Sequence, residues 1–197
     1  MFKTVALLSL VAFGAAYAAE KDMSEADHKA MMEKMQPGPE HKMLAKLAGN
    51  WEVASKWWMD PEKPPMESKG SSTFTVIYDG RFVRQDFKGE MMGQAFTGVG
   101  YDGFDNVTKK YTSFWLDSMG TSMFKVDGTS KDDGKTIEYT GEASCPMANG
   151  TAKTRWVHKA VSDDSFIFEM YMAPKGTEVK SGELTYTRKD GSRFPAV

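Results

Sequence analysis

The chain contains 197 residues, and 25 Lys and Arg against 27 Asp and Glu give it a formal charge of −2. This near balance does not provide the strongly basic surface that nucleic-acid binding requires, so we expect no nucleic-acid partner. Hydrophobic residues make up 41% of the sequence and aromatic residues 12%, which excludes a fully disordered chain. The single cysteine, Cys145, excludes an intramolecular disulfide and a zinc site built from several cysteines.

Residues 1–18 have the three-part pattern of a secretory signal peptide. Lys3 supplies the positive charge, residues 4–14 are uncharged and mostly apolar, and residues 16–18 read Ala-Tyr-Ala. The apolar run of about 11 residues is shorter than the roughly 20 that a transmembrane helix needs. We therefore expect cleavage before Ala19 and export to the periplasm or the cell exterior. No transmembrane segment should remain after cleavage; an uncleaved membrane anchor is the alternative.

The composition changes near residue 50. Residues 19–50 contain no aromatic residue, whereas all five Trp lie in residues 51–197. We predict a helical or flexible Met-rich lead at residues 19–37, which ends where Pro and Gly interrupt the helical pattern. A second short helix is predicted to begin at Pro39, because Pro suits the first turn of a helix. Residues 38–197 should form a single domain.

From Trp51 onward, apolar side chains alternate with polar ones, as in half-buried β-strands. Within residues 73–78, for example, Phe74, Val76 and Tyr78 share one face. No helix-length apolar pattern interrupts the series. The alternation predicts about ten strands. They lie near residues 50–59, 67–78, 81–89, 92–102, 109–117, 120–127, 135–143, 151–160, 164–172 and 179–189.

Dipeptides suited to tight turns separate the predicted strands. Asp or Asn followed by Gly supplies the positive φ angles that hairpin turns need. These dipeptides begin at Asp79, Asp102, Asp127, Asp133 and Asn149. A long meander of hairpins usually closes into a barrel, because closure removes the exposed edges. We therefore predict a mainly β fold, an antiparallel up-and-down barrel, with a β-sandwich as the alternative.

Three stretches of the sequence resemble a known family. Residues 40–51 end in Gly-Asn-Trp, residues 98–106 read GVGYDGFDN, and residues 111–118 read YTSFWLDS. Together they are similar to the bacterial family called domain of unknown function 1579, over about residues 38–189. The Gly-x-Trp sequence also resembles the start of the calycin barrels, which include lipocalins and fatty-acid-binding proteins.

The resemblance implies a calycin-like barrel and assigns no activity or catalytic residue. In calycin barrels the Trp of this motif closes one end of the barrel, and a basic residue of the last strand covers it. Trp51 and Arg188 occupy those places here. The resemblance therefore implies that Arg188 lies over the indole ring of Trp51.

Side chains that face the barrel interior are the candidates for ligand binding. Alternation predicts six of them: Trp57, Arg84, Trp115, Tyr139, Trp156 and His158. This largely aromatic set suits a small hydrophobic molecule, although the same rings could simply fill the core. Arg84 is a charged residue in an otherwise apolar strand, and the alternative place for it, on the surface, suits its charge better.

Metal or haem binding is an alternative function. In the lead, His28, Met31, Met32 and Met35 recur at helical spacing, and thioether and imidazole groups suit reduced copper. The same pattern is typical of an amphipathic helix that uses Met as an apolar residue. Nitrobindin-like barrels bind haem through a His, although no motif aligns His158 with that ligand.

Catalytic motifs are missing from the sequence. There is no Ser, His and Asp arrangement with a nucleophile elbow, and no Gly-rich phosphate loop precedes a helix. An enzyme that uses the barrel cavity is the third alternative, and it would need a polar cluster that the sequence does not locate. We predict a non-catalytic barrel that binds a small hydrophobic molecule. The sequence specifies neither a cofactor nor an oligomeric state.

Overall fold

The computed structural model describes residues 23–193. The predicted signal peptide, residues 1–18, lies outside the described residues, as do the first residues of the lead. The described chain divides into two units, residues 23–36 and residues 37–193. None of the helices in the described part of the chain has the length and apolar character needed to cross a membrane.

The first unit contains helix α2 (Glu25–Lys34). The helix begins after Ser24, whose hydroxyl oxygen accepts a hydrogen bond from the backbone N–H of Asp27 at 3.1 Å. No residue of α2 is buried, and the side chains of Met31 and Met32 are exposed. The helical lead expected from the sequence is therefore present, without a buried face within the described residues.

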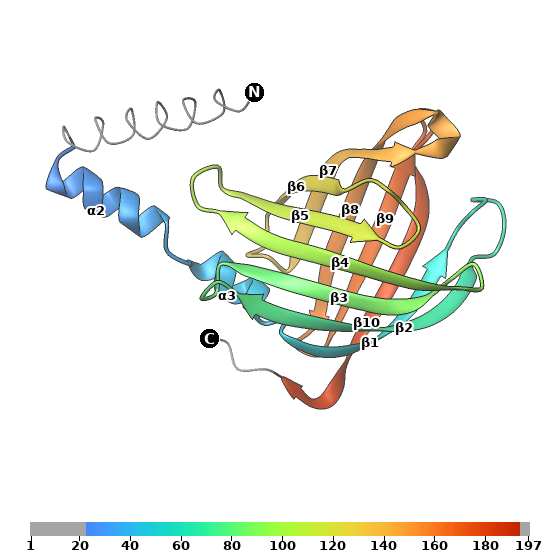
Figure 1. Ribbon diagram of the computed structural model, residues 1–197, viewed down its shortest axis with the longest axis horizontal. Helices are drawn as coiled ribbons and strands as arrows, with labels where there is room; N and C mark the ends of the chain where they lie inside the picture. Colours follow the sequence, from blue (N-terminus) through green and yellow to red (C-terminus); the bar gives the residue numbers. More distant parts are fainter. Residues whose placement is uncertain (1–22, 194–197) are drawn as a thin grey trace, which may run out of the picture. The chain divides into compact units, whose positions relative to one another are not determined.

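The second unit is an antiparallel β-barrel (Figure 1). Within the described residues its ten strands are β1 (Gly49–Trp57), β2 (Met66–Ile77), β3 (Phe82–Met91), β4 (Gln94–Asp105), β5 (Lys110–Asp117), β6 (Phe124–Ser130), β7 (Thr136–Cys145), β8 (Gly150–Ser162), β9 (Ser165–Ala173) and β10 (Val179–Arg193). Each strand pairs with the next along the chain, and β10 pairs with β1 to close the barrel. The predicted mainly β, up-and-down barrel is confirmed.

Two of the predicted turns are wrong. The dipeptide that begins at Asp102 lies inside β4, and the one that begins at Asp127 lies inside β6. Both Asp residues pair with neighbours on two adjacent strands, and this pairing outweighs the local turn preference of Asp-Gly. At the true turns, Asp79, Asp133 and Asn149 have the expected positive φ angles of 55°, 56° and 48°.

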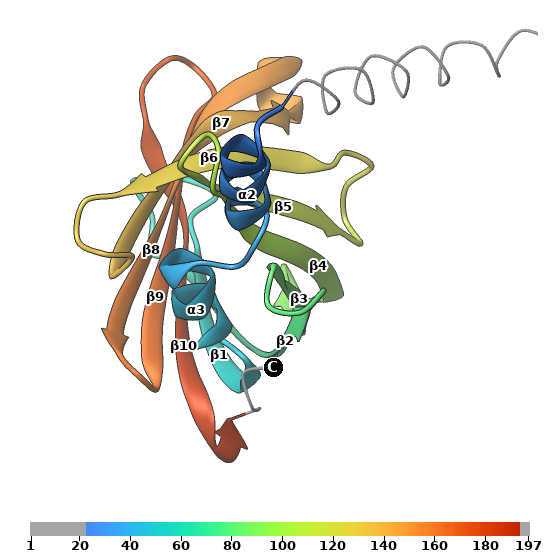
Figure 2. The same ribbon diagram turned by 90° about the vertical axis from the view of Figure 1, so that its left-hand side faces the viewer.

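Helix α3 (Pro39–Ala45) precedes β1 and covers one end of the barrel (Figure 2). The backbone N–H of Gly38 donates a hydrogen bond to Nδ1 of His41 at 3.0 Å, which fixes the start of this short helix. Leu44 is 3% exposed and belongs to the hydrophobic core. Because a helix of two turns is unstable alone in water, this burial is what holds α3 in place.

Trp51 closes the same end of the barrel. Its indole N–H donates to the carbonyl of Leu47 at 2.8 Å, and Arg188 covers the ring with its guanidinium carbon 4.1 Å from the ring centre. The guanidinium also donates to the carbonyls of Ala48 and Lys46, both at 2.7 Å. The predicted contact between Arg188 and Trp51 is confirmed.

Gly49 explains why the motif begins with glycine. Its φ angle is 136°, and a Cβ atom there would lie 2.2 Å from the carbonyl oxygen of Ser192. The same atom would lie 2.6 Å from Nη1 of Arg188. Only glycine lets Arg188 reach the carbonyl of Ala48.

Candidate ligand cavity

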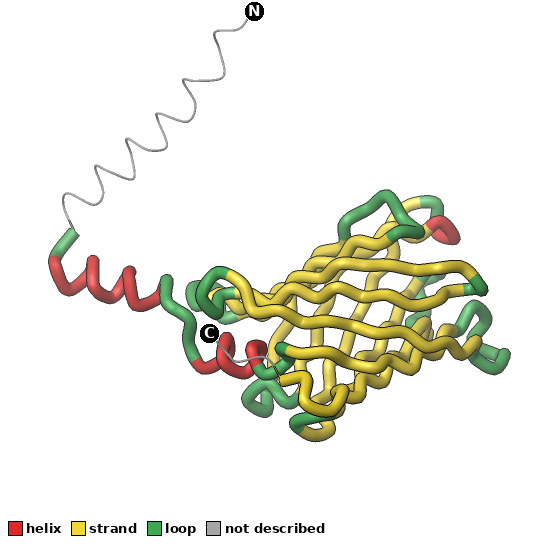
Figure 3. Tube along the Cα trace, turned by 60° about the horizontal axis from the view of Figure 1, so that its bottom comes forward, coloured by secondary structure: helices red, strands yellow, loops and turns green. Residues whose placement is uncertain are grey.

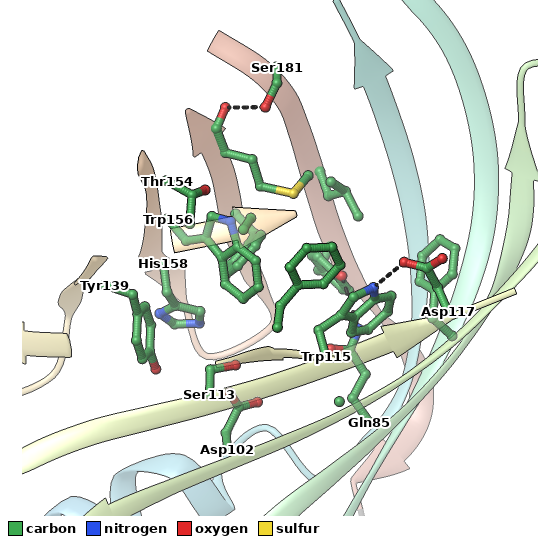
Figure 4. Close-up of a pocket in the computed structure, with 18 of the residues that line it drawn as sticks. Gln85, Asp102, Ser113, Trp115, Asp117, Tyr139, Thr154, Trp156, His158 and Ser181 are labelled. Atoms are coloured by element: carbon green, nitrogen blue, oxygen red, sulfur yellow. Dashed lines mark hydrogen bonds between the residues drawn. The ribbon is translucent and has the colours of Figure 1, made fainter. Parts of the chain in front are cut away.

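The barrel encloses a cavity of about 420 Å³ (Figure 4). Aromatic and aliphatic side chains make up most of its wall. Prominent among them are Trp57, Phe74, Phe87, Trp115, Trp156 and Phe168. The interior of this barrel is therefore not filled by its own side chains, and it has room for a small molecule.

Strand direction defines the two ends of the cavity. Neighbouring strands are antiparallel, so the odd-numbered strands run the same way and the loops that follow them gather at one end of the barrel. Figure 3 shows loops at both ends of the barrel. Met59 follows β1, Met92 follows β3 and Met147 follows β7; they line the cavity and are 65%, 47% and 68% exposed. We call this open end the mouth. Because α3 precedes β1, it lies at the opposite, closed end.

Five of the six predicted site residues line the cavity. They are Trp57, Trp115, Tyr139, Trp156 and His158. Trp115 stacks on Phe96 with ring centres 6.4 Å apart, and its indole N–H donates to a carboxylate oxygen of Asp117 at 3.0 Å. Trp156 meets Phe168 edge to face at 5.7 Å. These contacts fix the orientation of two aromatic walls.

Arg84 does not line the cavity, and the prediction that it faces inward is wrong. Its side chain is 44% exposed and pairs with the carboxylate of Asp86 at 2.7 Å on the outer face of β3. The inward residues of this strand are Val83, Gln85 and Phe87. Side chains alternate between the two faces of a strand, so burial of Val83 and Phe87 forces Arg84 outward.

The closed end of the cavity contains a group of polar side chains, which we call the deep polar group. It consists of Gln85, Asp102, Ser113, Tyr139 and His158. Asp102 lies close to the end of β4, while Ser113 and Tyr139 lie close to the starts of β5 and β7, so all three are near the closed end. Figure 4 shows Asp102, Ser113, Tyr139 and His158 gathered on one side of the cavity.

Asp102 is the ionisable carboxyl of this group. Its cross-strand neighbour on β5 is Ser113. Burial raises the pKa of Asp102 to about 6, against the opposing effect of the Ser113 hydroxyl. Burial also raises the pKa of Tyr139 and of Tyr186, and the charge of Asp102 adds to both shifts. The two phenols therefore stay neutral, and Asp102 is ionised at neutral pH.

His158 is 9% exposed, and neither ring nitrogen has a hydrogen-bond partner among the described residues. Its ring lies against Phe166, with ring centres 4.8 Å apart. Burial lowers the pKa of His158 to about 4, so the imidazole is neutral at pH 7. A buried polar side chain without a partner is uncommon, and here it faces a cavity.

Gln85 connects the deep polar group to the wall of the barrel. Its side-chain amide donates to the hydroxyl oxygens of Ser72 and Tyr186, both at 3.0 Å. These bonds fix the amide of Gln85, while its Cβ and Oε1 lie near Gly100 on the cavity wall. Hydrogen bonds within the barrel wall therefore fix the position of Gln85.

Asp102 is not among the predicted site residues, because Asp followed by Gly is typical of a turn. The alternation of inward and outward side chains along β4 indicates the correct place of Asp102. Phe96 and Gly100 line the cavity, and Asp102 follows on the same face. Counting by two from Phe96 therefore places Asp102 inside the barrel. In the described chain, no cluster of three His, Cys, Asp or Glu residues is arranged to hold a metal ion.

The fold and the cavity define a closed antiparallel β-barrel with a largely apolar interior. The family described as "Protein of unknown function (DUF1579)" matches residues 36–188, and the chain belongs to this family. A comparison with curated proteins gave no match.

Among solved structures, the barrel is similar to the protein in "Crystal Structure of Rv2717c from M. tuberculosis". The sequence identity is 14% and the TM-score 0.54, over 78% of this chain and 99% of that chain. At this identity the likeness shows the fold alone.

Proposed function

We propose that the protein binds a small, largely apolar molecule inside its barrel and catalyses no reaction on it. The observation that carries this proposal is the cavity of about 420 Å³, with its aromatic wall and exposed Met side chains at the mouth. Removing apolar surface from water contributes about 25 cal/mol per Å² before the costs of association. The signal-peptide pattern supports a site of action outside the cytoplasm.

The arrangement of the deep polar group supports binding over nucleophilic catalysis. A serine nucleophile needs a hydrogen bond to its general base. No hydrogen bond joins Ser113 to His158, because neither nitrogen of His158 has a partner within the described chain. The group therefore lacks the Ser–His pair of a catalytic triad.

A cavity-filling variant tests the proposal. Ala143 is 3% exposed and lines the cavity, whereas Ser144, the next residue of β7, is exposed on the outer face. We expect the neutral fluorescent probe N-phenylnaphthylamine to bind the mature protein. Ala143→Phe should weaken this binding at least about tenfold, because its ring would occupy the ligand volume. Ser144→Phe, the matched control, should bind as the wild type does.

Two results would overturn the proposal. One is equal binding of the probe by Ala143→Phe and the wild type, which would place the probe outside the cavity. The other is no binding by the folded wild type of this probe or of any member of a panel of uncharged apolar molecules. Circular dichroism melts confirm that each variant is folded. If Ala143→Phe does not fold, the smaller substitution Ala143→Leu replaces it.

Haem is a second candidate ligand, favoured by His158. A buried, neutral imidazole with both nitrogens unpartnered is a suitable donor for iron. When bound, haem would supply redox and gas-binding chemistry, and His158 would hold it. A haemin titration followed by absorbance tests this candidate. Loss of the spectral shift in His158→Ala would support it, and the same shift in both proteins would reject it.

A further inference from the structure

We propose that the ligand carries a protonated amine, which binds to the carboxylate of Asp102 at the closed end of the cavity. Its apolar tail then extends toward the mouth. This inference rests on the proposed binding function and adds the chemical class of the ligand.

The charge of the cavity favours a cationic ligand. Among the described residues that line it there is no Lys or Arg, whereas Asp102 and Asp117 are both present. Asp117 lies at the end of β5, near the mouth, and accepts hydrogen bonds from the Trp115 indole and from the backbone N–H groups of Met119 and Gly120. A ligand carboxylate would meet two negative charges and no positive one. A ligand cation would find a complementary charge.

Asp102 has unused hydrogen-bonding capacity. A carboxylate has about four acceptor positions, and among the described residues only the hydroxyl of Ser113 affects that of Asp102. Burying a carboxylate without a cation is unfavourable. A ligand ammonium group carries three N–H donors and a positive charge, so it satisfies both needs at once.

His158 also favours a ligand that donates hydrogen bonds. Its imidazole is nine-tenths buried, faces the cavity and has no protein partner on either nitrogen. A neutral imidazole accepts one hydrogen bond and carries no positive charge that would repel a cation. The ring therefore offers a second acceptor to the amine, alongside Asp102.

The distribution of side chains sets the orientation of the ligand. The deep polar group lies near the closed end, while Met59, Met92 and Met147 surround the mouth. Flexible Met side chains adapt to alkyl chains of different length. The head group should therefore be recognised closely, and the tail loosely.

Three probes with ten carbon atoms each and different head groups test this inference: decylamine, decanol and decanoate. Each probe is titrated against N-phenylnaphthylamine bound to the mature protein at about pH 7.5. The concentration of each probe stays below its own critical micelle concentration. We expect decylamine to bind at least about tenfold more tightly than decanoate, a difference of about 1.4 kcal/mol. Decanol should fall between them.

A pair of matched variants locates the effect. Asp102→Asn keeps the size of the side chain but removes the charge. It should weaken decylamine binding at least about tenfold and change decanol binding by less than about threefold. Asp86→Asn is the control, because Asp86 lies on the outer face of the neighbouring strand and pairs with Arg84. It should leave the affinities for all three probes unchanged.

A pH titration of the wild type needs no variant. Lowering the pH from about 7.5 to about 5 protonates Asp102, while the amine stays charged, so decylamine should bind about tenfold more weakly. The titratable groups that face Asp102 are Tyr139, Tyr186 and His158, and all three stay neutral over this range. Decanol binding should not change.

The outcomes separate this inference from the proposed function. If decanoate binds as tightly as decylamine, or if Asp102→Asn keeps the preference for the amine, the inference is overturned and apolar binding stands. If the folded protein binds none of the three probes, both proposals fail. An amine preference that disappears in Asp102→Asn and persists in Asp86→Asn supports the inference.

Discussion

Asp102 and His158 face one cavity without forming a hydrogen bond to each other. Asp102 pairs across the strands with Ser113, and both nitrogens of His158 lack a partner within the described chain. Burial shifts the two pKa values in opposite directions, to about 6 for Asp102 and to about 4 for His158. In both residues the buried environment favours the neutral form.

These shifts predict opposite effects of pH on stability. For Asp102 the folded state binds the proton more tightly than the unfolded state. Its contribution to the free energy of unfolding is therefore largest below about pH 4 and is lost as the pH rises through about 6. For His158 the unfolded state binds the proton more tightly. Its contribution is therefore complete above about pH 6.5 and is lost as the pH falls through about 4. Each contribution is roughly 3 kcal/mol at most.

Urea unfolding between about pH 4 and about pH 7 tests this pair. Relative to the wild type, Asp102→Asn should become more stable as the pH rises from about 4 to about 6. His158→Gln should become relatively more stable as the pH falls from about 6.5 to about 4. Stability curves that run parallel to that of the wild type in either variant would contradict the assigned shift.

Arg188 should be important for stability because its guanidinium occupies the closed end of the barrel. Arg188→Met removes the contact with the Trp51 ring and leaves the carbonyls of Ala48 and Lys46 without their donor. We expect a loss of about 2–4 kcal/mol in the free energy of unfolding. Arg188→Lys should recover only part of it, because an ammonium group does not reproduce the planar fork of donors.

The control for Arg188 is Arg84→Met, which changes an exposed Arg on the outer face of β3. Its stability should differ from that of the wild type by less than about 0.5 kcal/mol. Equal losses in Arg84→Met and Arg188→Met would show that the position of the Arg is unimportant.

The two helices should differ in their importance for the barrel. A protein that begins at Pro37 should melt within a few degrees of the full mature chain, because α2 has no buried residue. Leu44→Ala in α3 should cost about 2–4 kcal/mol, since Leu44 is buried in the core. Loss of cooperative melting in the truncated protein would make the lead part of the folded core.

The same truncation tests the copper hypothesis. If His28, Met31, Met32 and Met35 bind reduced copper, uptake of the ion should disappear in the truncated protein. Equal copper uptake by the two proteins would reject the lead as the copper site.

Gly98 should be intolerant of a side chain, because of its position against the ring of Trp115. A Cβ atom at Gly98 would lie 2.2 Å from a ring carbon of Trp115, which forces the ring to move. Gly98→Ala should cost about 1–3 kcal/mol and shift the tryptophan emission. Gly150→Ala is the control, because a Cβ there meets no atom closer than 3.9 Å. An unchanged spectrum in Gly98→Ala would show that the Trp115 ring stays in place, which contradicts the prediction.

The barrel and its closed end were predictable because their signals are local in sequence. Alternation with a period of two located every strand, although the ends of several strands lie a few residues away from the prediction. Closure followed from a long run of strands without helical cover. The contact between Arg188 and Trp51 came from the resemblance to calycin barrels, and the strand pairing places the two residues directly opposite each other.

The cavity and its polar end depend on the tertiary structure. Asp102-Gly103 has the composition of a turn, and only pairing with β3 and β5 shows that it continues a strand. Arg84 and Gln85 are adjacent in sequence, and the burial of Val83 and Phe87 decides which of them faces inward. Interior volume depends on how side chains from ten strands meet, a property that no single strand contains. Local alternation therefore determines which face of a strand is buried, whereas closure of the barrel determines what that face encloses.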